Sequence, residues 1–126
     1  MSNIRIMNAK RHLIICRRPP YGESYAREAL DVALAAAAFD QDIALLFLGD
    51  GVAQLLNAHD SAAIGEKSLE KQLSALPLYD IDSIYADAAA LQQRGFTAAD
   101  LSLPAQAVND AEIATLLKNH DLVLNF

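Results

Sequence analysis

Two short apolar runs, each closed by a chain break, dominate the first third of the sequence. Residues 12–16 and 43–48 are apolar at nearly every position, and segments 17–22 and 49–51, which contain Pro or Gly, follow them. Runs of this length and composition are typical of strands that are buried on both faces. Residues 23–39, between the runs, are rich in alanine and leucine and contain no breaker, which favours a helix.

The same alternation continues to the end of the chain. Further strands are expected at 83–86, 105–108 and 121–126; further helices at 52–56, 68–76, 88–94 and 111–119; and a loop at 61–65. Pro77 ends one of these helices, Gly95 follows another at its C′ position, and Asn109 or Asp110 caps the last.

This order of elements predicts one doubly wound α/β domain over residues 12–126. We expect a mainly parallel five-stranded sheet with helices on both faces and flavodoxin-like layering. Residues 1–11 lack periodicity and are expected to form a flexible N-terminal arm. In such folds ligands bind at the carboxyl ends of the strands, so the loops at 17–22, 49–57, 86–88 and around 109 hold the candidate residues.

Charge is unevenly distributed along the chain. The net charge is −6, but residues 1–27 carry +5, with Glu23 their only acidic residue, so the remainder carries −11. An acidic body repels phosphate backbones, and direct tRNA contact is therefore not expected. No apolar run approaches the roughly 20 residues that cross a bilayer. The start of the chain also lacks a signal-peptide core, so no membrane association and a cytoplasmic location are expected.

Motifs for common cofactors and metals are missing from the sequence. Cys16 is the single cysteine, which excludes an internal disulfide and a cysteine-built metal site. The histidines His12, His59 and His120 show no metal-ligand spacing. Neither a GxSxG nor an HExxH motif occurs, so no metal, no cofactor and no ordinary hydrolase chemistry is expected.

The Asp50–Gly51 loop allows two interpretations. A GxGxxG motif starting at Gly49 would need glycine at position 54, where the chain has Gln54. A tight turn at the end of a strand explains the glycines without a ligand. A regulatory domain that binds a small ligand or nucleotide through this loop is the alternative.

Cys16 and Asp87 each have a structural and a functional interpretation. Arg17 and Arg18 beside Cys16 would lower a thiol pKa and favour a reactive thiolate, whereas cysteine also packs as a small buried apolar residue. Asp87 lies where a strand meets the helix that starts at Ala88, so it either caps that helix or belongs to a site at the sheet edge.

Several separated segments together resemble one known family. They are Pro20-Tyr21-Gly22 with residues 26–31, Asp50-Gly51-Val52 with residues 54–56, and the stretches 78–81, 91–95 and 121–126. In this combination the chain is similar to the TusC/DsrF subunits of the DsrE/DsrF-like sulfur-relay family, from about residue 12 to the end. Residues 1–11 and the Arg17-Arg18 pair have no counterpart in that pattern.

The resemblance implies a role in passing a persulfide between proteins. It implies TusB-like and TusD-like sister subunits in a heterohexamer with two copies of each, and an indirect connection to a downstream sulfur acceptor protein. The relay serves 2-thiolation of the tRNA wobble uridine or, in Dsr systems, sulfur oxidation. In the sulfur-carrying subunit the active cysteine precedes the short helix that ends in Arg-Gly, and counting back from Arg94-Gly95 gives Asp87.

An aspartate cannot hold a persulfide, so the resemblance implies a non-catalytic subunit rather than an enzyme. The loop and interface candidates are then Tyr21, Gly22, Asp50, Gly51 and Asp87. Cys16 as a persulfide carrier remains the alternative from the enzyme class.

Overall fold

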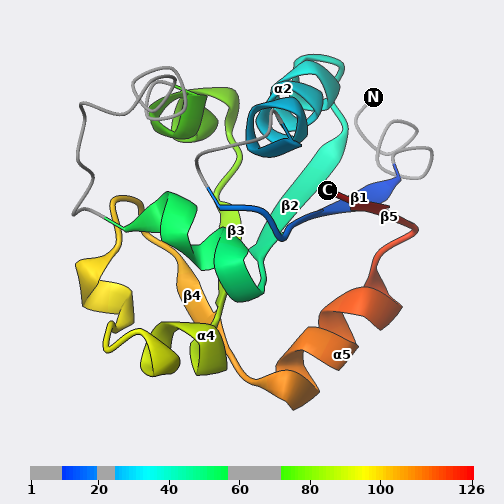
Figure 1. Ribbon diagram of the computed structural model, residues 1–126. Coiled ribbons are helices and arrows are strands. Elements are labelled where there is room, and N and C mark those ends of the chain that lie inside the picture. The colour runs from blue at the N-terminus through cyan, green and yellow to red at the C-terminus, as the bar shows by residue number, and fades with distance from the viewer. Residues whose placement is uncertain (1–9, 20–24, 57–71) are drawn as a thin grey trace.

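The computed structural model describes residues 10–19, 25–56 and 72–126, which form a parallel sheet and its covering helices (Figure 1). The strands are β1 (Arg11–Cys16), β2 (Asp42–Phe47), β3 (Ser83–Asp87), β4 (Gln106–Val108) and β5 (Leu122–Asn125). The α-helices are α2 (Tyr25–Ala38), α4 (Ala88–Gln93) and α5 (Asp110–Asn119). Short 3₁₀ helices are η1 (Gly49–Leu55), η2 (Leu76–Tyr79) and η3 (Ala98–Asp100).

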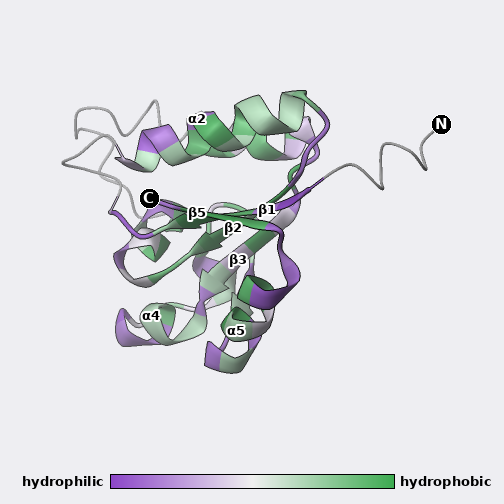
Figure 2. Ribbon diagram, turned by 90° about the vertical axis from the view of Figure 1, so that its right-hand side faces the viewer, coloured by the Kyte–Doolittle hydropathy of each residue, from purple (hydrophilic) through white to green (hydrophobic). Residues whose placement is uncertain are grey.

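The strand order β4-β3-β2-β1-β5 explains where the helices lie. The chain steps in one direction from β1 to β4 and then returns across the sheet to β5, with every pair parallel. Because crossovers between parallel strands are right-handed, the connections that lead from β1 through β2 and β3 to β4 lie on one face of the sheet, and the connection from β4 to β5 lies on the other face. Figure 2 accordingly shows α2 on one side of the strands and α5 on the opposite side.

Two apolar clusters, one on each face, follow from the alternation of side chains along the strands. Ile14 and Leu45 belong to the larger cluster, which α2, η1, η2 and α4 complete. Leu13 and Leu46 belong to the smaller one, against which Ile113 and Leu116 of α5 pack. Because β1 and β2 are buried on both faces, their sequences are apolar at consecutive positions.

The predicted architecture, a single α/β sheet with helices on both faces, is confirmed, and the sheet is parallel throughout rather than mainly so. Most boundaries move by one or two residues. β1 starts at Arg11, inside the predicted arm, and β4 starts at Gln106. The helix expected at 52–56 is the 3₁₀ helix η1, which starts earlier, at Gly49.

Some expected elements lie wholly or partly outside the described residues. They are residues 1–9 of the predicted arm, Tyr21 and Gly22, the loop at 61–65 and the first part of the helix at 68–76. The described end of that helix covers residues 72–75 and continues into η2, where Pro77 occupies an early position in the 3₁₀ turn.

The helix η1 is fixed against the end of β1 at a single backbone group. The carbonyl oxygen of Cys16 accepts a hydrogen bond from Leu48 N at 3.0 Å, and Gly51 N in turn donates to Leu48 O at 2.8 Å. A Cβ built on Gly51 would overlap the same Cys16 carbonyl oxygen. The glycine at position 51 is therefore required by close packing of two backbone segments.

Replacing this glycine should cost more stability than replacing its neighbour Gly49. Gly51→Ala forces η1 away from β1 and is expected to lower the free energy of unfolding by about 3 kcal/mol. Gly49 has a positive φ of 52° but open space around it, so Gly49→Ala should cost only about 1 kcal/mol. Urea denaturation of both variants measures the difference, and an equal or larger loss for Gly49→Ala would contradict the packing argument.

Candidate functional site at the carboxyl edge of the sheet

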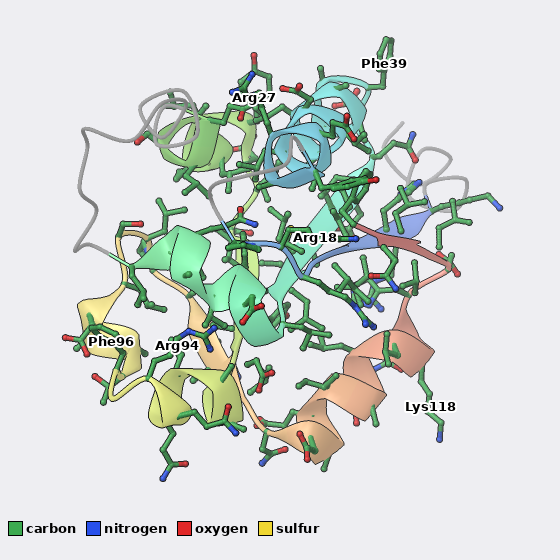
Figure 3. The ribbon with its side chains drawn as sticks, viewed as in Figure 1. Arg18, Arg27, Phe39, Arg94, Phe96 and Lys118 are labelled. Atoms are coloured by element: carbon green, nitrogen blue, oxygen red, sulfur yellow. The ribbon has the colours of Figure 1, made fainter. Side chains whose placement is uncertain are left out.

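The carboxyl ends of the strands gather the charged candidates at one edge of the sheet. Arg17 and Arg18 follow β1, Asp50 follows β2, and Asp87 is the last residue of β3. Figure 3 shows Arg18 beside β1 and Arg94 between η1 and α4. The edge is therefore basic beside β1 and acidic beside β2 and β3.

Asp87 joins two elements through its carboxylate. One oxygen, Oδ1, accepts from Ala90 N at 3.3 Å, which makes Asp87 the N-cap of α4. The other oxygen, Oδ2, accepts from Gly49 N at 3.2 Å, at the start of η1. The structure thus has the capping geometry that the sequence suggested and adds a second bond that the sequence did not indicate.

Asp50 and Arg94 form an ion pair between η1 and the end of α4. Arg94 Nη2 donates to Asp50 Oδ1 at 2.6 Å, with 30% of the arginine side chain and 70% of the aspartate side chain exposed.

The end of helix α4 is followed by Gly95, as the sequence predicts. Gly95 occupies the C′ position and has a φ of 76°. Gly95 N donates to Gln92 O and Phe96 N donates to Leu91 O, which is the pattern of a Schellman motif.

Cys16 is a core residue. Its side chain belongs to the cluster on the α2 face and its residue is 1% exposed. Burial raises the pKa of the Cys16 thiol to about 12, so at neutral pH the thiol is protonated and a poor nucleophile. The neighbouring arginines do not offset this effect, and the geometry fits the packing interpretation.

The segment after β1 is held by backbone and side-chain contacts. Arg17 N donates to Phe126 O at 3.0 Å, which bridges β1 and β5 at the point where the strand order reverses. Arg18 O accepts from Gln54 Nε2 at 2.8 Å, and the Arg18 guanidinium carbon lies 4.7 Å from the centre of the Tyr25 ring. At the edge where such sheets usually bind ligands, these groups of the described chain are thus engaged in contacts within the chain.

Gln54 has a structural role that the sequence pattern did not indicate. It is fully buried, and its Oε1 atom lacks a hydrogen-bond partner. From the sequence, a single polar residue within 52–56 would be expected at the surface. Its partner, Arg18 O, is far away in the sequence, so local residue spacing gives no sign of the contact. Of the other predicted site residues, Gly51 packs on Cys16, while Tyr21 and Gly22 lie outside the described residues.

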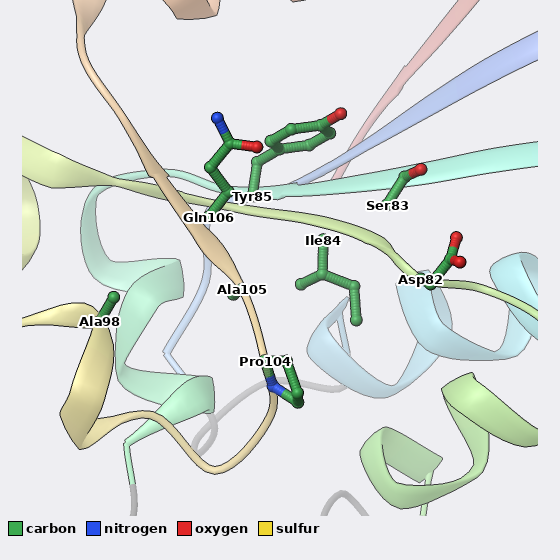
Figure 4. Close-up of a pocket in the computed structure, with 8 residues that line it drawn as sticks. All are labelled: Asp82, Ser83, Ile84, Tyr85, Ala98, Pro104, Ala105 and Gln106. Atoms are coloured by element: carbon green, nitrogen blue, oxygen red, sulfur yellow. The ribbon is translucent and has the colours of Figure 1, made fainter.

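One pocket lies at the beginning of β3 and β4, away from Asp87 (Figure 4). It has a volume of about 590 Å³. Its lining residues are Asp82, Ser83, Ile84, Tyr85, Ala98, Pro104, Ala105 and Gln106. The lining contains neither a cysteine nor a cationic side chain, and its polar side chains are those of Asp82, Ser83, Tyr85 and Gln106.

Within residues 10–19, 25–56 and 72–126 there is no cluster of three His, Cys, Asp or Glu side chains that could hold a metal ion. Across these ranges no helix is long and apolar enough to span a membrane.

Comparison with known proteins agrees with this geometry. The sequence model of the DsrE/DsrF-like family matches residues 10–126. The chain belongs to the DsrE/DsrF-like family. This confirms the resemblance drawn from the separated segments.

Two curated relatives cover most of the chain. A protein named TusC homolog from Pseudomonas aeruginosa is 39% identical over 112 residues, covering 89% of this chain and 94% of its own. The intracellular sulfur oxidation protein DsrF of Allochromatium vinosum is 36% identical, covering 93% of this chain and 96% of its own. Among solved structures, the YchN protein of E. coli has a TM-score of 0.80 at 19% identity, covering 93% of this chain and 99% of its own, which shows the shared fold.

The buried thiol predicts a specific dependence of stability on pH. The pKa of Cys16 is raised in the folded chain from 9.0 to about 12, so its contribution is fully present below pH 9 and is lost as pH rises toward 12. The free energy of unfolding should fall in this window by up to about 1.4 kcal/mol per pH unit from this group. Denaturation of wild type and Cys16→Ala at several pH values isolates the effect, because the other titrating groups are common to both. Parallel pH profiles would contradict it.

Proposed function

We propose that this chain is a non-catalytic subunit of a sulfur-relay complex, in which a persulfide passes between proteins. Its partners would be TusB-like and TusD-like sister subunits in a heterohexamer, and the complex would support 2-thiolation of the tRNA wobble uridine. The family membership and the TusC and DsrF names of the relatives support the sulfur-relay part of this proposal. The chain would act by docking, without transferring sulfur itself.

The observation that carries the proposal is the use of the Asp87 carboxylate. At the position where the resemblance expects a sulfur-carrying cysteine, the side chain binds Ala90 N and Gly49 N and stabilises α4 and η1. A carboxylate cannot form a persulfide, and its charge repels an incoming persulfide anion. The same backbone N–H groups would stabilise a thiolate in a subunit that has cysteine there.

The two alternative functions are less well supported by the geometry. A persulfide carrier needs an accessible thiolate, whereas Cys16 is buried and protonated. A nucleotide site at the Asp50–Gly51 loop needs free backbone donors, whereas Gly49 N donates to Asp87 Oδ2 and Gly51 N donates to Leu48 O. The Asp50 side chain pairs with Arg94. Both loop residues are committed to internal contacts.

The role in a complex predicts stable association with the sister subunits. Co-expression with a TusB-like and a TusD-like chain should give a complex that survives size-exclusion chromatography with equal amounts of the three chains. Loss of this chain from the cell should then lower 2-thiouridine in tRNA, measured by mass spectrometry of digested nucleosides. A chain that elutes alone beside its sisters would contradict the subunit role. Unchanged tRNA thiolation would instead point to sulfur oxidation.

The position of Asp87 predicts which substitution would create a sulfur carrier. After incubation with glutathione persulfide, the wild-type chain should show no added sulfur atom on Cys16 by peptide mass spectrometry. Asp87→Cys should gain one sulfur at position 87, because its thiolate attacks the terminal sulfur of the donor and releases glutathione thiolate. Sulfur on Cys16 of the folded wild type would revive the carrier alternative. An unreactive residue at 87 would argue against this position as the family's cysteine site.

A further inference from the structure

The pocket at the start of β3 and β4 results from the late start of the edge strand β4. β3 pairs with β2 from Ser83 onward, whereas its pairing with β4 begins only at Tyr85 and Gln106. Pro104, just before this pair, has no N–H group to donate to a neighbouring strand. The chain before Gln106 therefore passes β3 without joining the sheet, and a pocket of about 590 Å³ lies there (Figure 4).

The polar side chains of this pocket have no partner within the described part of the chain. They belong to Asp82, Ser83, Tyr85 and Gln106. Tyr85 and Gln106 are partners in the register, so their side chains lie next to each other on one face of the sheet, as Figure 4 shows. Among residues 10–19, 25–56 and 72–126, none of the four side chains forms a hydrogen bond or an ion pair. Their donors and acceptors are thus available to a ligand.

The charge around the pocket is negative. In residues 72–117, which contain β3 and β4, the only basic residue is Arg94, and it pairs with Asp50 at the opposite edge of the sheet. The acidic residues of the same range are Asp80, Asp82, Asp87, Asp100, Asp110 and Glu112. Such an excess of negative charge repels anions and attracts cations. The pocket is therefore suited to a positively charged ligand.

The lining favours an organic cation over a metal ion. Asp82 is the only carboxylate among the lining residues, whereas divalent metal sites in proteins use several oxygen ligands. An ammonium group carries three N–H donors and no acceptor, which matches the carboxylate, hydroxyl and amide oxygens of the pocket. The rest of the lining suits a hydrocarbon group, since it consists of Ile84, Ala98, Pro104 and Ala105.

We propose that this pocket binds a small organic amine in its protonated form. The ammonium group pairs with Asp82, and the hydrocarbon part lies against the apolar part of the lining. The volume of about 590 Å³ lies within the usual range of small-molecule sites. Because the pocket is at the amino edge of the sheet, the ligand leaves the contacts of Asp87 with Gly49 and Ala90 intact.

The experiment is a titration of the ¹⁵N-labelled chain with 2-phenylethylamine, followed by ¹H–¹⁵N correlation NMR. The amide signals of residues 82–85 and 105–106 should shift and saturate, with a dissociation constant on the order of 1 mM. The matched ligands are 2-phenylethanol and 3-phenylpropanoate, which replace the ammonium group by a neutral and a negative group. Both should bind at least about threefold more weakly than the amine.

Asp82→Asn tests the charge of the pocket while the shape of the side chain is kept. The affinity for the amine should fall at least about threefold, and binding of 2-phenylethanol should not change. Asp80→Asn is the matched control, because Asp80 is also exposed near the start of β3 but does not line the pocket. Its φ of 61° is a conformation that asparagine tolerates. This variant should bind the amine like the wild type, and the dispersion of each spectrum checks the fold.

Several outcomes would overturn the proposal. They are shifts that do not saturate, shifts confined to the carboxyl edge, and equal binding of the amine and 3-phenylpropanoate. Equal losses in Asp82→Asn and Asp80→Asn would also overturn it, since they indicate attraction by the overall charge instead of a site. A lysine blocked at both backbone ends that binds more tightly than the amine would overturn the small-molecule assignment and indicate a protein side chain. All these results are independent of the sulfur-relay proposal, because only this chain and its pocket are measured.

Discussion

The contact between η1 and the end of β1 organises the carboxyl edge of the sheet. The Cys16 carbonyl receives the Leu48 amide and lies directly against Gly51, so the chain after β2 must fold back over the end of β1. From this position η1 reaches Arg18 through Gln54 and Asp87 through Gly49. These contacts lie at the edge of the sheet where comparable folds bind their ligands.

The same contact determines whether the thiol of Cys16 is accessible to solvent. A side chain at the end of a central strand becomes accessible only if the loop above it is open, and here η1 closes it. Val52 and Leu55 of η1 join Cys16 in the core cluster, and burial keeps the thiol protonated. Asp87, one strand further from β1, stays partly exposed. In this fold the end of β3 is thus the more suitable place for surface chemistry.

The sequence pattern predicted the strands well where both of their faces are buried. Strands β1 and β2 are apolar at consecutive positions because both faces are covered, and Gly95 marks a helix end because that position has positive φ. The strand order could not be predicted, since local pattern does not record neighbours. β5 shows the limit clearly: Leu122 to Leu124 form an apolar run typical of a buried strand, yet they are partly exposed at the sheet edge.

In the candidate site, the sequence could predict contacts between residues that are close together in the chain. Asp87 caps the helix that follows it, as its position before Ala88 suggested. The Asp50–Arg94 pair and the Gln54 contact join segments far apart in the chain, so no spacing rule could show them.

The uneven cover of the sheet connects the topology with the proposed role as a subunit. The connections from β1 to β4 lie on one face of the sheet, and the connection from β4 to β5 lies on the other. The last strand, β5, therefore lies beside β1 at the edge of the sheet, and no described helix covers it on the α2 face. A monomer gains less from an apolar strand in that position than from a central strand, because Leu122, Val123 and Leu124 remain 37–42% exposed. The arrangement becomes favourable when another chain supplies the missing layer. In the proposed role as a subunit, a partner chain would cover this apolar run.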